Sequence, residues 1–182
     1  MTRSMPFKIF LLAIWVACAG CVHRIQMAPL HPNAPSLTIP RTVQAVIGPI
    51  SMEGPDHRPG IALLEWSQLD LTQAILRYLQ QRGTFVSVSP DPADLTMDVA
   101  TKLSLTSRQN RYHYRILLRA DMSEAADLIK SYRTEQTAVG SSARWVTASD
   151  RDPIQQALQA ALDDLMRQIE ADGPLYTSRK SD

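Results

Sequence analysis

The sequence predicts an α+β domain with a single mixed or antiparallel sheet and two helices packed on one face of it, in the order β-α-β-β-β-β-α. Residues 95–106 and 112–122 alternate strictly between apolar and polar side chains, which is typical of two half-buried strands in an antiparallel hairpin. Residues 68–82 and 153–172 instead repeat apolar side chains at helical spacing. The helices would bury one face of the sheet and leave the other face in water.

The first strand of the domain is predicted over residues 42–50 (TVQAVIGPI), where apolar residues alternate and Val46 adds partial burial on the second face. Residues 51–60 carry two glycines and two prolines, which predict a loop. Residues 61–66 are apolar, but the run is too short to decide between helix and strand.

The first helix is predicted to start near Ser67, because Ser67 and Asp70 have the S-x-x-D spacing of a capping box. Gly83 suits the left-handed position that ends a helix. The apolar positions of this helix are Leu69, Thr72, Leu76 and Leu79, with Ile75 beside them. A short strand over 85–88 follows, before a break at Pro90-Asp91-Pro92.

The hairpin is predicted to turn at residues 107–111 and to continue, after a second turn at 123–127, into a third strand over 128–139. Residues 140–151 then read as a loop. The last helix opens with Asp152 as N-cap and Pro153 as its first residue, and Gly173-Pro174 stops it. Its apolar stripe consists of Ile154, Leu158, Ala161, Leu162, Leu165 and Ile169. The polar residues 174–182 are predicted to form a disordered tail.

The N-terminal residues 1–20 have the pattern of a secretory signal peptide, with basic Arg3 and Lys8 before an apolar run. That run, Ile9–Ala19, is shorter than the roughly 20 residues that span a bilayer. The following Cys18-Ala19-Gly20-Cys21 resembles the lipobox of bacterial lipoproteins, although Cys18 stands where Leu, Val or Ile is usual. The resemblance implies that Cys21 is acylated and becomes the mature N-terminus. The alternatives are a plain cleaved signal peptide, which leaves Cys21 as a thiol, and an uncleaved apolar anchor.

Cysteine content and charge agree with this interpretation. Cys18 would leave with the signal, so an exported chain would keep one cysteine and could form no internal disulfide. Loss of Arg3 and Lys8 leaves 17 basic against 18 acidic residues, a net charge of −1. This balance does not indicate a nucleic-acid partner.

Residues 21–40 are predicted to be the lipidated cysteine and an extended tether, because they contain Pro29, Pro32, Pro35 and Pro40. Alternatively, the C-terminal part of this segment, with Leu37 and Ile39, packs on the domain as an edge. The folded domain is then expected over residues 41–173, which is long enough for one core.

The sequence contains no G-x-S-x-G, H-E-x-x-H, P-loop or C-x-x-C motif, and its four histidines lack a second ligand at metal spacing. We therefore expect no enzyme activity, metal or cofactor. Two polar groups remain as candidate contact sites. The first is the loop residues Asp56, His57 and Arg58, which could equally be a solvated turn. The second is a basic cluster on the hairpin, which could equally be a solvated face: Arg108, Arg111, His113, Arg115 and Arg119, with Lys102 nearby.

The order of elements from TVQAVIGPI through ADLTMDVATKL to DPIQQALQAALDDL resembles that of small periplasmic lipoproteins of Gram-negative bacteria. The auxiliary lipoproteins of ABC-type transporters and the penicillin-binding-protein activator lipoproteins are the families it is similar to. The resemblance implies a non-catalytic accessory or assembly subunit of an envelope complex, anchored by acyl chains. Val22 after the acylated cysteine resembles the outer-membrane sorting signal, which would place the domain in the periplasm. The alternative is a lipoprotein that itself binds a small ligand, lipid or glycan. The oligomeric state stays open.

Overall fold

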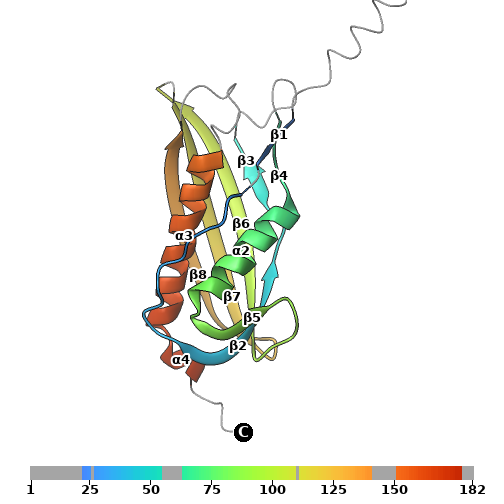
Figure 1. Cartoon of the computed structure of the whole chain (residues 1–182), viewed down its shortest axis with the longest axis vertical. Coiled ribbons are helices and arrows are strands. Elements are labelled where there is room, and N and C mark those ends of the chain that lie inside the picture. The colour runs from blue at the N-terminus through green and yellow to red at the C-terminus, as the bar shows by residue number, and fades with distance from the viewer. Residues whose placement is uncertain (1–21, 26, 55–62, 110, 141–150, 178–182) are drawn as a thin grey trace, which may run out of the picture.

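The computed structural model describes residues 22–25, 27–54, 63–109, 111–140 and 151–177. Its centre is a mixed six-stranded sheet with the order β5-β2-β6-β7-β8, in which β3 also pairs with β6 (Figure 1). A separate two-stranded sheet joins β1 and β4. The strands are β1 (Val22–Ile25), β2 (Ile39–Ile47), β3 (Ser51–Glu53), β4 (Leu63–Trp66), β5 (Phe85–Ser89), β6 (Leu95–Arg108), β7 (Arg111–Glu124) and β8 (Asp127–Gly140). The helices are α2 (Gln68–Arg82), α3 (Arg151–Ala171) and α4 (Pro174–Thr177).

The predicted α+β class is therefore confirmed. Three short strands are added to the predicted order: β1 inside the predicted tether, β3 inside the predicted 51–60 loop, and β4 in the run 61–66 that the sequence left undecided. β2 runs parallel to both β5 and β6, while β6, β7 and β8 form an antiparallel meander. β2 pairs with β6 up to Ile47↔Val99, and β3 resumes the pairing at Ser51↔Lys102. β2 and β3 thus pair one after the other, both in parallel, with successive segments of β6.

The alternation predicted for the hairpin is confirmed, except that Ser104, predicted on the wet face, is buried. Leu95, Met97 and Val99 on β6 are buried, and so are Ile116 and Leu118 on β7. Both helices lie over this buried face: α2 packs on β2 and β5, and α3 packs on β7 and β8 (Figure 1). The residues in between point to the opposite side, which we call the outer face. None of the described helices covers that face (Figure 1).

Helix α2 starts and stops where the sequence predicts, but its buried side differs from the predicted stripe. Leu71, Ile75 and Tyr78 are completely buried, whereas Leu69 is 63% exposed. The predicted stripe was correct for Ile75 and Leu79 but wrong for Leu69, because the buried side also includes Leu71, Tyr78 and the polar Arg82. The capping box is also absent, since the Ser67 side chain makes no capping hydrogen bond. Gly83 has φ 73°, the left-handed conformation that a glycine adopts without strain.

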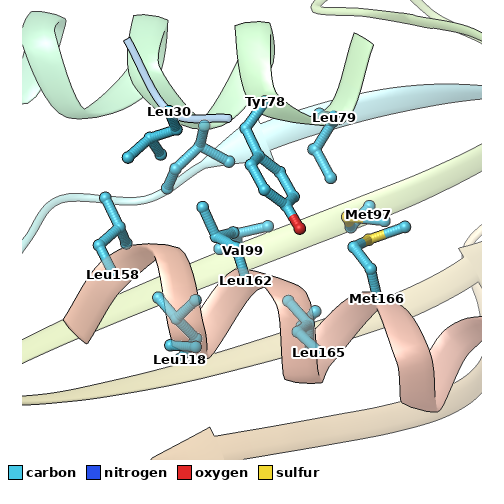
Figure 2. Packing of buried hydrophobic residues seen from close by; sticks show 14 of the residues in the cluster. Leu30, Tyr78, Leu79, Met97, Val99, Leu118, Leu158, Leu162, Leu165 and Met166 are labelled. Atoms are coloured by element: carbon cyan, nitrogen blue, oxygen red, sulfur yellow. The ribbon is translucent and has the colours of Figure 1, made fainter. Parts of the chain in front are cut away.

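Helix α3 buries every residue of its predicted stripe, and Figure 2 shows Leu158, Leu162 and Leu165 among them. They meet side chains from the sheet and from α2. Burial of each leucine side chain contributes about 1.5–3 kcal/mol. Within the described residues, no helix is both long and apolar enough to cross a membrane.

The predicted tail from residue 174 begins instead with the short helix α4. Tyr176 is buried, and its hydroxyl lies 2.6 Å from the hydroxyl of Tyr132 on β8. Lys130 lies near the same place and forms an ion pair with Asp172 at 2.7 Å. Residues 174–177 are therefore part of the folded domain, because a buried tyrosine pair holds them against the sheet.

The structure also places residues 27–38 on the domain rather than in a free tether. This segment, which we call the strap, lies between α2 and α3 (Figure 1), and Leu30 is only 4% exposed. Gln155 and Gln159 of α3 accept hydrogen bonds from the backbone N–H groups of Ala28 and His31. The prolines do keep the strap extended, but α3 side chains accept hydrogen bonds from its backbone, and Leu30 is buried while Leu37 stays exposed.

Candidate functional site

The basic residues predicted as a contact site lie on the hairpin, but the structure divides them into two groups. His113, Arg115 and Arg119 project from the outer face of β7, along its length. Arg108 and Arg111 end β6 and begin β7 and are paired with each other in the register. We call Arg108, Gln109 and Arg111 the hairpin tip.

The arginines along the strands are neutralised by acidic neighbours. Arg115 lies 3.3 Å from Glu135 of β8, and Arg119 lies 2.9 Å from Asp121. Hydrogen bonds from Ser131 and from Arg119 lower the pKa of Asp121 below its usual value. The nearby Lys102 pairs with Glu53 of β3 at 2.7 Å. The outer face is thus a surface of mixed charge rather than a basic patch.

Among the described residues, no acidic side chain compensates the charges of the hairpin tip in this way. Arg108 and Arg111 are exposed, and among the described residues neither forms an ion pair. Like charges directly opposite each other in an antiparallel pair are unfavourable. Gln109 has a positive φ of 49°. This left-handed conformation is unfavourable for a residue other than glycine. The tip therefore keeps two positive charges together at a cost to stability.

Two other predicted sites fall outside the described residues: the lipidation site Cys21, and the loop Asp56, His57 and Arg58. What the structure does show is that β1 begins at Val22, immediately after Cys21. Across the described part of the chain, no group of three or more His, Cys, Asp or Glu side chains could hold a metal ion.

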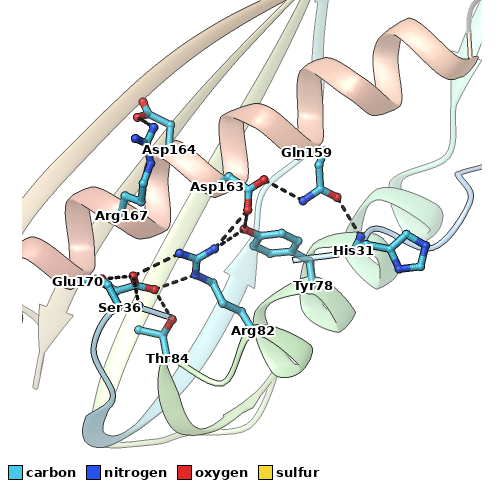
Figure 3. Close-up of polar contacts among 10 residues, drawn as sticks. All are labelled: His31, Ser36, Tyr78, Arg82, Thr84, Gln159, Asp163, Asp164, Arg167 and Glu170. Carbon is cyan, nitrogen blue, oxygen red and sulfur yellow. Dashed lines mark hydrogen bonds and ion pairs between the residues drawn. The ribbon is translucent and has the colours of Figure 1, made fainter. Parts of the chain in front are cut away.

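A buried ion pair between the helices is the main polar feature that the sequence analysis missed. Arg82 of α2 binds Glu170 of α3 through two contacts, Nε to Oε1 at 2.7 Å and Nη2 to Oε2 at 3.2 Å (Figure 3). Thr84 donates to Oε1 at 2.7 Å, while the backbone N–H and the hydroxyl of Ser36 donate to Oε2 at 3.0 and 2.7 Å. Protein donors thus surround the Glu170 carboxylate, including two from the strap.

The pKa of Glu170 reflects this balance. Burial by itself would raise the pKa, but the hydrogen bonds from Arg82, Ser36 and Thr84 outweigh burial and lower the pKa to about 2. Burial also opposes the charge on Arg82, yet the contacts with Glu170 and Tyr78 raise its pKa. The pair is therefore ionised across the whole physiological pH range.

The same network continues toward the start of α3. The Tyr78 hydroxyl donates to Asp163 at 2.7 Å, and Arg82 reaches the same carboxylate oxygen at 3.2 Å. Gln159 donates to the other oxygen of Asp163 and accepts from the backbone N–H of His31 (Figure 3). Burial, and then the bond to Asp163, raise the pKa of Tyr78. The network joins α2, α3 and the strap into one unit.

A weak signal of this network is present in the sequence. Glu170 follows Met166 by four residues and adjoins Ile169, so helical periodicity places it on the flank of the apolar stripe. Arg82 follows Tyr78 by the same interval. Neither spacing indicates that the two charges meet, because that depends on how the helices pack.

Two hollows flank the strap. One, of about 170 Å³, lies toward α2 between Met27 and Arg77. The other, of about 370 Å³, lies toward α3 and is lined by Pro29, His31, Asp152, Gln155, Gln156 and Gln159. Neither is the deep apolar pocket that direct binding of a lipid would require.

No family model and no curated protein matches this chain. Its fold is similar to that of a Xanthomonas campestris protein described by the family model DUF330, with 13% identity and a TM-score of 0.55 over 85% of this chain and 97% of that one. A hypothetical protein of Chlamydia trachomatis has 12% identity and a TM-score of 0.50 over 74% and 98%. A putative lipoprotein of Caulobacter crescentus has 14% identity and a TM-score of 0.42 over 72% and 86%. At these identities the likeness to the first two proteins is one of fold alone.

Proposed function

We propose that this chain is an outer-membrane lipoprotein, anchored through acyl chains on Cys21, whose domain faces the periplasm and acts as a non-catalytic accessory or assembly subunit of an envelope complex. The anchor is supported by the lipobox-like Cys18-Ala19-Gly20-Cys21 and by Val22, which differs from the aspartate that retains lipoproteins in the inner membrane.

The observation that carries the accessory role is the uncovered outer face of β6, β7 and β8. Its charged side chains are exposed and of both signs, with Arg119 opposite Arg133 and Glu135 within reach of Arg115. Paired charges of this kind add little to the stability of the domain. They are suited to a protein surface of complementary charge, where they set orientation and specificity. The buried polar groups around Glu170, in contrast, already bind one another and hold the fold together.

The anchor is tested by Cys21→Ser, with Cys18→Leu as the matched control. Without an acyl-accepting thiol, the Cys21→Ser protein should be soluble or keep its uncleaved signal. Cys18→Leu should stay in the membrane fraction, because leucine is usual at that lipobox position. The measurement is fractionation of Gram-negative cells with an alkaline wash, together with metabolic labelling by a palmitate analogue. If Cys21→Ser remains labelled and membrane-bound, the anchor lies elsewhere.

The contact surface is tested with a photo-crosslinking residue placed at Thr137 on the outer face or at exposed Ala160 on α3. We expect envelope proteins to be crosslinked from Thr137, and this capture to fall when Arg115 and Arg119 are changed to Ser. Capture from Ala160 alone, or capture unaffected by the arginine changes, would mean that the outer face is only a solvated surface.

A further inference from the structure

The proposed anchor enters the domain at one end of its long axis. β1 begins at the residue after Cys21, and consecutive Cα atoms are about 3.8 Å apart. β1 then pairs with β4 from Val22↔Leu63 onward, so the chain enters the fold at once instead of passing through a tether of twenty residues. Acyl chains on Cys21 would hold this end of the domain at the bilayer surface.

The hairpin tip lies at the same end. In Figure 1 the start of β1, the turn between β6 and β7 and the start of α3 are all at the top, while α4 and the C-terminus are at the bottom. The pairing agrees with the view, because Gly140, the last residue of β8, pairs with Tyr112 beside the tip. An anchor at Cys21 would therefore bring the tip toward the headgroups.

The charges at this end are distributed unevenly. Arg151 at the start of α3 forms an ion pair with its neighbour Asp152 at 3.0 Å. Arg108 and Arg111 face each other across the turn, and no acidic side chain among the described residues pairs with either. Guanidinium groups bind phosphate oxygens through two parallel hydrogen bonds. Two arginines beside a membrane anchor, with no ion-pair partner among the described residues, match a surface of anionic phosphates.

We propose that Arg108 and Arg111 contact anionic phospholipid headgroups of the membrane that holds Cys21, and so orient the domain with its hairpin tip down and α4 pointing away. The inference rests on the proposed lipid anchor. Each arginine near an anionic membrane surface contributes about 1 kcal/mol to the free energy of attraction. Two arginines therefore favour the orientation with the tip toward the membrane by about 30-fold. That effect is too weak to recruit a soluble protein, but an anchored domain is already at high effective concentration beside its membrane.

The test uses the full, acylated protein with Gln109→Cys as its single free thiol, since Cys18 leaves with the signal and the Cys21 thiol carries an acyl chain. A fluorophore on this thiol is quenched by headgroup spin-labelled lipid when the tip touches the bilayer. We expect strong quenching in phosphatidylcholine vesicles that contain phosphatidylglycerol, and weaker quenching without it or at high salt. A label at Ala171→Cys, at the end near α4, should stay unquenched in both.

The variants separate the tip from the rest of the hairpin. Arg108→Gln with Arg111→Gln should lower the ratio of tip-down to other orientations about 30-fold. The double variant Arg115→Gln with Arg119→Gln removes the same amount of charge from β7, but from two arginines that form ion pairs. It should leave the quenching unchanged. Equal effects of the two double variants, or quenching independent of phosphatidylglycerol, would overturn the inference.

Flotation of the vesicles distinguishes failure of the anchor from failure of this inference. If the protein does not float, the lipid anchor is wrong and the inference falls with it. If it floats but the label at residue 109 is never quenched, the anchor stands and the tip does not meet lipid. Unchanged quenching combined with reduced crosslinking of a protein in the Arg108 and Arg111 double variant would assign the tip to a protein partner, which also overturns the inference.

Discussion

Arg82 and Glu170 form a bidentate ion pair across the helix layer, although 88 positions separate them in the chain. Their side chains are 3% and 0% exposed, and the closest contact is 2.7 Å. Because Ser36 donates to the same carboxylate, this pair joins α2, α3 and the strap. Loss of either charge would leave the other buried without a partner.

Glu170→Gln should therefore destabilise the domain by about 3–5 kcal/mol, because it keeps the shape of the side chain but leaves the charge of Arg82 uncompensated. Arg167→Gln is the matched control on the same helix: Arg167 pairs with Asp164, but its side chain is 67% exposed. Its loss should cost no more than about 1 kcal/mol. The measurement is the urea midpoint at constant slope. Equal shifts in the two variants would mean that burial of the pair has no special effect.

Stability should also fall with acidification through Glu170. Its pKa is about 2 in the folded domain against an ordinary value of 4.5. The unfolded chain therefore takes up the proton first, so the stabilisation is complete above about pH 5 and is lost as the pH approaches 2. The shift corresponds to about 3 kcal/mol. In thermal melts across this range, Glu170→Gln should have a flatter dependence than the unchanged protein. A parallel dependence would assign the acid sensitivity to other carboxylates.

Ser36→Ala should loosen the strap without unfolding the domain. The variant removes a 2.7 Å hydrogen bond to a buried carboxylate, and such a bond contributes about 1.5–3 kcal/mol. Hydrogen exchange should quicken at Ala28 and His31, whose N–H groups bind α3, while Thr38→Ala at an exposed position should change nothing. If these amides exchange at unprotected rates in the unchanged protein, the strap is a free tether after all.

Substitutions in the turn between β7 and β8 should stabilise the domain. Ala125 and Ala126 have φ values of 48° and 75°, which place two alanines in the left-handed region. Asn-Gly is the preferred pair for a two-residue hairpin turn with positive φ at both positions. The double change Ala125→Asn with Ala126→Gly should raise the free energy of unfolding by about 1 kcal/mol. Ala160→Gly, at an exposed helical position, should instead lower it by about 1 kcal/mol. The measurement is again the urea midpoint, and destabilisation by both changes would show that the turn is not strained.

The elements that depend on local pattern were predictable. The strict alternation in β6 and β7 has a period of two, and a one-residue shift would have put every apolar side chain in water, so the buried face follows from the sequence. The stripe of α3 was equally clear, because all six of its predicted residues are apolar and buried. The sequence predicts the bounds of helix α2 correctly but not its full buried side. That side includes Tyr78 and Arg82, which the apolar pattern does not mark.

The candidate sites were predictable only as residue types. The basic residues of the hairpin are evident in the sequence, but which of them are neutralised depends on cross-strand neighbours such as Glu135, supplied by β8. The juxtaposition of the two tip arginines emerges only when the register places Arg108 opposite Arg111.

The sequence by itself determined the fold class, the bounds of helix α2, the buried stripe of α3, and the inward and outward sides of the hairpin. Each of these follows from the order of apolar and polar residues within a few turns or strands. Only the tertiary structure decided that Arg82 meets Glu170, that Tyr176 meets Tyr132, and that the proline-rich strap lies between two helices. These contacts join residues far apart in the chain, and they form because buried polar groups must find partners wherever packing brings them together.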